Sequence, residues 1–123
     1  MLLDAECAWF GDPAFDVAFC LTHLLLKTLV HPDRVAELLS ASRALAGAYT
    51  AHVDWEEAAG LDHRVASLLP ALLLARVDGA SPVEYLTSPA DREDVRTFTA
   101  PLLRQSVSST AEVIARWAAR RQG

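Results

Sequence analysis

The sequence has little cysteine, little glycine and no excess of basic charge, and each shortage excludes a class of function. Cys7 and Cys20 form no Cys-x-x-Cys pair, so they favour free thiols in a reducing compartment over a zinc site or a disulfide framework. The five glycines form no glycine-rich loop that could cover phosphates. The formal net charge of −5 argues against a nucleic-acid partner.

Long uninterrupted hydrophobic runs are also lacking. The most apolar stretch, residues 17–30, is interrupted by His23 and Lys27 and is too short to span a bilayer. No basic segment leads into an apolar stretch near residue 1, so no secretory signal is indicated. We therefore expect a cytoplasmic protein with no membrane and no nucleic-acid partner.

The chain is rich in apolar, helix-forming residues. Alanine and leucine are its commonest residues and 52% of the chain is hydrophobic, which favours a mainly α fold. A length of 123 residues suits a single domain, with a short strand and turn over residues 1–12 and a helical region over residues 13–123. The apolar excess also indicates a face that another domain or a partner covers.

Hydrophobic periodicity predicts the first three helices. Residues 16–29 are apolar nearly all round, so we expect them to form a buried central helix. Residues 32–53 keep the i, i+3, i+4, i+7 rhythm of an amphipathic helix. A third helical region begins near residue 62 and ends at Gly79, and Pro70 within it indicates a kink or two short helices.

Two serine–proline pairs predict the remaining helix starts, because serine is a common N-cap and proline suits the first helical position. Ser81-Pro82 precedes a short helix around residues 85–86. Ser88-Pro89 precedes a long helical stretch to about residue 121, with weak points at Pro101 and over residues 106–110.

Several isolated side chains favour structural roles. We expect Arg76 to pair with an acid such as Asp78 or one from a neighbouring helix, and Trp117 to anchor a core or an interface. The arginines near the C-terminus complement a helix dipole; they are Arg116, Arg120 and Arg121.

The opening nineteen residues carry the strongest functional pattern. Residues 2–6 favour a short strand, in which Asp4 and Glu6 are two apart and therefore point to the same face. Two carboxylates on one face beside the turn at residues 11–13 suit Mg²⁺. This ion usually takes one or two carboxylates from a protein, and phosphate and water fill its remaining coordination positions. The alternative is a pair of solvated acids at a strand end. Asp16 stands at the N-cap or first turn of the next helix.

This segment resembles the metal-binding segment of the aminoglycoside phosphotransferase and choline kinase superfamily, relatives of the protein kinases that phosphorylate small molecules. The family pattern is an apolar strand that ends in Asp, often as Asp-x-Glu, then a Gly-Asp-Pro-like turn and a second Asp that leads into a helix. The matching residues are Asp4, Glu6, Gly11, Asp12, Pro13 and Asp16.

The resemblance implies a role for each acid. Asp4 is expected to bind Mg²⁺, and Glu6 to be a second direct or water-mediated ligand. Asp16 is expected to support the active site by capping its helix and accepting hydrogen bonds from the catalytic-loop backbone. The complete enzyme is expected to use Mg²⁺ with ATP, and the helices after residue 30 to frame the pocket for a small-molecule acceptor.

The catalytic loop of that family is missing from this sequence. The loop has the form His-Gly-Asp, with an Asn five residues after the Asp, and supplies the base and a metal ligand. The residues five positions after Asp12, Asp33 and Asp54 are Val17, Leu38 and Ala59. We therefore expect the C-terminal part of a phosphotransferase, with no catalytic residue of its own and no tightly bound cofactor, whose partner is the missing N-terminal lobe.

Two other functions remain open on the sequence. The chain could be a non-catalytic helical module that binds a partner through an apolar surface, or a small helical ligand-binding domain with a coincidental opening motif. The strand predicted over residues 2–6 has no evident pairing partner in the sequence, and an exposed strand edge favours association. We therefore expect self-association of the isolated chain.

Overall fold

The computed structural model describes residues 13–51, 58–78, 88–105, 107 and 109–122. These residues contain helices and no strand, which confirms the mainly α class. The elements are α2 (Pro13–Val30), the 3₁₀ helix η1 (Pro32–Arg34), α3 (Val35–Ala51), α4 (Ala58–Asp78), α5 (Pro89–Arg104) and α6 (Thr110–Gln122). No single one of these helices is long and apolar enough to cross a membrane. The strand predicted over residues 2–6 and the short helix predicted around residues 85–86 lie outside the described residues.

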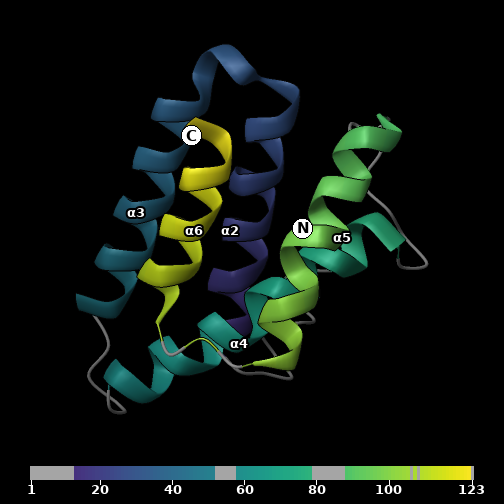
Figure 1. The fold of residues 1–123 in the computed structure, drawn as a ribbon. Helices are drawn as coiled ribbons and strands as arrows, with labels where there is room; N and C mark the ends of the chain where they lie inside the picture. The colour runs from purple at the N-terminus through teal and green to yellow at the C-terminus, as the bar shows by residue number, and fades with distance from the viewer. Residues whose placement is uncertain (1–12, 52–57, 79–87, 106, 108, 123) are drawn as a thin grey trace, which may run out of the picture.

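Helices α2 and α4 are the two elements around which the others pack. In Figure 1, α2, α3 and α6 stand side by side, α4 runs across one end of this group, and α5 lies on the side opposite α3. Helix α2 contacts both α3 and α4 extensively, α5 packs against α4, and α6 packs against α3 and α4. The buried hydrophobic side chains of all five α-helices belong to one cluster.

The sequence of α2 explains its central position. Between residues 14 and 30 the exposed side chains are Cys20 and Lys27, while Leu21, Leu25 and Leu26 are fully buried. A helix that is apolar nearly all round is stable only when neighbours cover it on all sides. The buried central helix predicted from the sequence is therefore confirmed, and it begins at Pro13, earlier than expected.

Helix α5 begins with the predicted cap. The Ser88 hydroxyl accepts a hydrogen bond from the backbone N–H of Asp91 at 3.3 Å, and Pro89 occupies the first turn. This contact satisfies one of the backbone donors that every helix start leaves without an intrahelical partner.

Helix α6 begins with a similar cap and a link to α4. The Ser109 hydroxyl accepts a hydrogen bond from the Glu112 N–H at 3.1 Å. The Thr110 N–H donates to the Asp62 carboxylate, and the Thr110 hydroxyl donates to the Asp62 carbonyl oxygen, both at 3.2 Å. These bonds fix the start of α6 on α4, so they set where the rest of α6 lies.

Two helix boundaries differ from the sequence prediction. The stretch predicted over residues 88–121 is two helices, which are separated at the predicted weak point around residues 106–110, whereas Pro101 lies inside α5. Helix α4 begins at Ala58 instead of near residue 62 and continues through Pro70 as one helix. Pro70 is buried in the packed interior of the protein, so tertiary packing offsets the hydrogen bond that proline removes.

A buried hydrogen bond joins α6 to α2. The Trp117 side chain is fully buried, and its indole N–H donates to the Thr28 hydroxyl at 2.8 Å. The Thr28 hydroxyl in turn donates to the Leu25 carbonyl oxygen at 2.6 Å. The Trp117 ring also meets Phe98 of α5 edge to face, with ring centroids 4.9 Å apart. Trp117 of α6 therefore contacts two other helices, α2 and α5, which confirms the prediction that it is a core anchor.

Replacing Thr28 with Val removes the acceptor of this hydrogen bond and nearly keeps the shape of the side chain. The Trp117 indole N–H is then buried without a partner, so we expect the free energy of unfolding to fall by about 1–3 kcal/mol. Chemical denaturation followed by far-ultraviolet circular dichroism measures the change.

Thr22→Val is the matched control. Thr22 is also buried in α2, and its hydroxyl donates to the Ala18 carbonyl oxygen at 2.7 Å, an intrahelical bond of the same kind. We expect a smaller loss for Thr22→Val than for Thr28→Val. Equal losses would show that the hydrogen bond from Trp117 contributes nothing to stability.

Candidate functional site

The predicted metal-binding segment immediately precedes α2 in the chain. Asp4 and Glu6 lie outside the described residues, while Pro13 and Asp16 lie in the first turn of α2. Asp16 is half-buried and stands inside the helix, so it is a first-turn acid and not the N-cap. A carboxylate in this position offsets the positive end of the helix dipole.

An aromatic row follows this turn along α2. Phe15, Phe19 and His23 are spaced by four residues and so share one face of the helix. The ring centroids of Phe15 and Phe19 are 6.1 Å apart, and His23 meets Phe19 edge to face at 4.9 Å. The guanidinium of Arg76 lies 5.9 Å from the centroid of the Phe19 ring, within the range of a cation–π contact. This contact joins α4 to the first half of α2.

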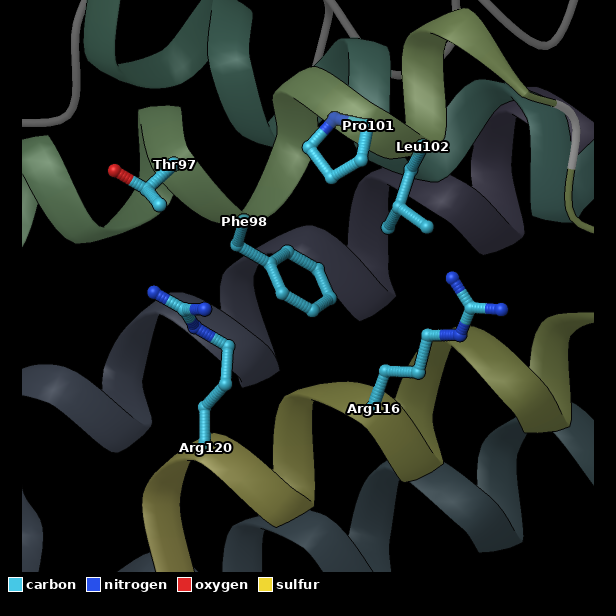
Figure 2. A pocket seen from close by; sticks show the side chains of 6 residues that line it. All are labelled: Thr97, Phe98, Pro101, Leu102, Arg116 and Arg120. Atoms are coloured by element: carbon cyan, nitrogen blue, oxygen red, sulfur yellow. The ribbon is translucent and has the colours of Figure 1, made fainter.

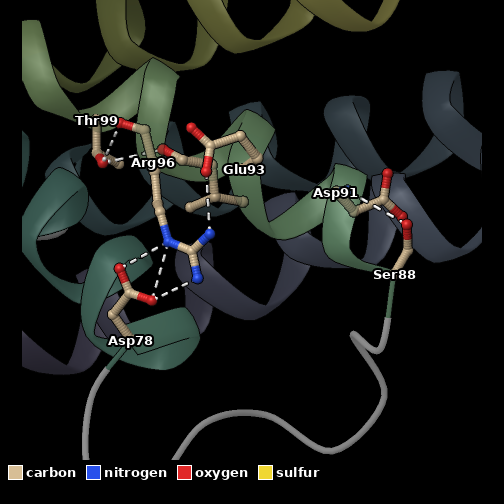
Figure 3. A network of polar contacts seen from close by, with 7 residues as sticks. Asp78, Ser88, Asp91, Glu93, Arg96 and Thr99 are labelled. Atoms are coloured by element: carbon tan, nitrogen blue, oxygen red, sulfur yellow. Dashed lines mark hydrogen bonds and ion pairs between the residues drawn. The ribbon is translucent and has the colours of Figure 1, made fainter.

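Asp78 pairs with Arg96 of α5, and not with Arg76 as the sequence suggested. The Arg96 Nε donates to both carboxylate oxygens of Asp78 at 3.0 and 2.9 Å, and Nη2 donates at 2.7 Å (Figure 3). Nη1 donates to Glu93 at 3.1 Å. The hydrogen bonds from Arg96 lower the pKa of Asp78 below its ordinary value. The end of α4 is thus held against α5 by a forked, charge-assisted contact.

Replacing Arg96 with Gln should return the pKa of Asp78 toward its ordinary value. Because folding lowers this pKa, the pair stabilises the protein above the unfolded-state pKa, which is about 4. That contribution is lost as the pH falls through the folded-state pKa, and it is small because the pair is exposed. A carbon-13 NMR titration of the Asp78 carboxyl group measures the midpoint in the two proteins.

Arg34→Gln is the control for this titration. Arg34 is an exposed arginine of η1 that pairs with Glu37 of α3 at 2.9 Å. Its replacement should leave the midpoint of the Asp78 titration unchanged. The same Asp78 midpoint with and without Arg96 would contradict the assigned cause of the shift.

A groove of about 210 Å³ opens between α5 and α6. Its lining residues are Thr97, Phe98, Pro101 and Leu102 of α5 and Arg116 and Arg120 of α6. Figure 2 shows the Phe98 ring between the two arginines, whose side chains extend from α6 on either side of it. The groove therefore combines an apolar floor with two cationic groups.

The arginines of α6 also have partners within the protein. Arg120 and Arg121 both donate to Asp94 of α5, one to each carboxylate oxygen. Arg116 donates to Glu112 one turn earlier on α6. The Arg120 guanidinium lies 5.7 Å from the Phe98 ring centroid. The predicted role of these arginines at a helix C-terminus thus accounts for only part of what they do, because two of them also link α6 to α5.

Sequence reasoning did not find this groove. The one available signal was the four-residue spacing of Arg116 and Arg120, which places both on one face of a helix. The Phe98 side of the groove comes from a different helix, and only the packing of α5 beside α6 brings it near the arginines.

Within the part of the chain that the structure describes, no group of three or more His, Cys, Asp or Glu side chains could hold a metal ion. Asp4 and Glu6 lie outside that part of the chain. In comparisons with known proteins, no family model, no curated protein and no solved structure matches this chain.

Proposed function

We propose that this chain is the C-terminal helical part of an ATP-dependent small-molecule phosphotransferase of the aminoglycoside phosphotransferase and choline kinase type, inactive by itself. The observation that carries the proposal is the Asp4-to-Asp16 pattern together with the helix that follows it. Val17 is buried and Ala18 is fully buried, so the pattern leads directly into the most enclosed helix of the fold. A metal-binding segment needs a rigid neighbour of this kind to hold its ligands in place.

The donor set at positions 4 and 6 fits Mg²⁺. Carboxylate oxygens are hard ligands, and one or two of them are what Mg²⁺ usually takes from a protein. In the proposed site Asp4 is the direct ligand and Glu6 is a second direct or water-mediated ligand. Mg²⁺ held by these residues would supply positive charge that neutralises the charge developing during phosphoryl transfer.

Asp16 has an electrostatic role in this proposal. The N-terminal end of a helix carries a partial positive charge of about half a proton charge, which repels a cation held next to it. The Asp16 carboxylate in the first turn of α2 offsets that charge. Asp16 is therefore a supporting residue that makes the start of α2 compatible with a metal ion, and it does not take part in the chemistry.

The residues that complete a kinase site are missing from the sequence. It contains no His-Gly-Asp loop followed by the required Asn, and no glycine-rich loop. In kinases these elements supply the catalytic base, a metal ligand and the cover over the phosphates. The proposed partner is therefore a lobe that carries them, and the proposed substrate of the complete enzyme is a small molecule.

Paramagnetic Mn²⁺, which binds the same oxygen ligands as Mg²⁺, tests the metal segment. We expect Mn²⁺ to broaden selectively the amide NMR signals at the start of α2, over residues 14–18. Asp4→Asn should weaken this binding on the order of tenfold, because it removes one of two protein ligands.

Asp33→Asn is the control for Mn²⁺ binding. Asp33 is an exposed acid in η1, which follows the C-terminal end of α2, so its replacement should leave the broadening unchanged. The proposed metal-binding segment would be refuted if the signals of residues 14–18 broadened equally in Asp4→Asn. It would also be refuted if Mn²⁺ did not broaden them in the unmodified chain.

Titration calorimetry with Mg·ATP tests the proposed dependence on another lobe. We expect no micromolar binding, because this sequence supplies neither a glycine-rich loop nor a catalytic loop to contact the phosphates. Micromolar affinity for Mg·ATP would show that the chain contains a nucleotide site of its own, contrary to the proposal.

A second function, that of a non-catalytic ligand-binding module, is supported by one specific observation. The α5–α6 groove brings arginines and an aromatic ring together at a site that is separate in sequence from Asp4 and Glu6.

A further inference from the structure

We propose that the α5–α6 groove binds a small organic oxyanion with a flat apolar body, such as an aryl phosphate or an aryl carboxylate. The apolar body lies on the floor of the groove and the anionic group binds the arginines of α6. This site does not depend on the proposed phosphotransferase function, because it uses no residue of the metal-binding segment.

The floor of the groove is apolar and held in place. Phe98 and Leu102 are only 5% and 6% exposed, so the packed interior fixes their positions. The Phe98 ring is held edge to face against the fully buried Trp117, at an interplanar angle of 86°. The apolar floor is therefore preformed, and the side chain that must reorient when a flat ligand binds is Arg120, whose guanidinium lies over the Phe98 ring.

The cationic side of the groove is accessible. The side chains of Arg116 and Arg120 are 52% and 34% exposed, and their four-residue spacing places them on one face of α6. Each guanidinium has five N–H donors in a planar fork, which matches the oxygens of a phosphate or a carboxylate. The hydrogen bond of Arg120 to Asp94 uses Nη2 and leaves further donors of the same guanidinium for a ligand.

The present partners of these arginines do not block the site. Asp94 receives hydrogen bonds from both Arg120 and Arg121, so it keeps a partner when Arg120 turns toward a ligand. Arg116 is paired with Glu112 in an exposed contact within one helix, a kind of ion pair that is easily exchanged. Each of these hydrogen bonds uses one of the five N–H donors of its guanidinium, so Arg116 and Arg120 can also donate to an anion in the groove.

The size of the groove limits its occupant. A volume of about 210 Å³ is smaller than the pockets of roughly 300–1,000 Å³ that hold drug-sized molecules. One aromatic ring with one anionic group therefore suits the groove better than a nucleotide does.

Nitrogen-15 NMR titrations with three probes test the proposal. Phenyl phosphate should shift the amide signals of Thr97 and Leu102 in a saturable way. Inorganic phosphate lacks the apolar body and phenol lacks the anion, so each should bind at least about tenfold more weakly. Equal binding of all three probes, or non-saturable shifts with phenyl phosphate, would overturn the proposal.

Charge-neutral variants test the role of the arginines. Arg116→Gln and Arg120→Gln should each weaken phenyl phosphate binding about tenfold, because each removes one forked donor. Arg34→Gln, an exposed arginine outside the groove, should leave binding unchanged. Circular dichroism confirms that each variant is folded. Loss of binding in Arg34→Gln, or full binding in both groove variants, would contradict the assignment.

A dilution series separates the proposed ligand from a second copy of the chain. If another copy covered the groove, the Thr97 and Leu102 signals would change with protein concentration in the absence of any probe. We expect them to stay constant, and a concentration-dependent change would overturn the proposal.

Discussion

The burial of α2 on nearly all sides is the constraint on which the rest of the structure depends. Helices α3 and α4 cover two of its sides, and the hydrogen bond from Trp117 to Thr28 fixes α6 on it. Trp117 also supports Phe98, so the floor of the α5–α6 groove depends indirectly on α2. The proposed metal segment enters the same helix at Pro13. The groove therefore depends on the helix that the proposed metal-binding segment immediately precedes in the chain.

Much of the helical structure could be predicted because its causes are local. The all-round apolar pattern of residues 16–29 predicted a central helix, and the Ser88-Pro89 pair predicted the start of α5. The prediction at Pro70 allowed a kink or two short helices, and the structure has one helix there. Pro70 lies within one continuous helix because tertiary packing offsets the missing hydrogen bond, and a single sequence does not show that packing.

The candidate sites could be predicted only in part. Asp16 was placed correctly at the start of α2, whereas Asp4 and Glu6 remain predictions because they lie outside the described residues. The pairing of Asp78 with Arg96 spans 18 residues and depends on how α4 meets α5, so proximity in sequence wrongly favoured Arg76. The groove was missed for the same reason: its two sides come from separate helices, and the four-residue spacing of arginines has simpler explanations.

Native-state hydrogen exchange tests the central role of α2 most directly. Amide exchange in a helix that is buried between its neighbours requires global unfolding, whereas peripheral helices open locally at lower free energy. We predict that the amides of α2 from Leu21 to Thr28 are the slowest to exchange, with an opening free energy equal to that of global unfolding. Faster exchange in α2 than in α5, through local opening, would contradict the account.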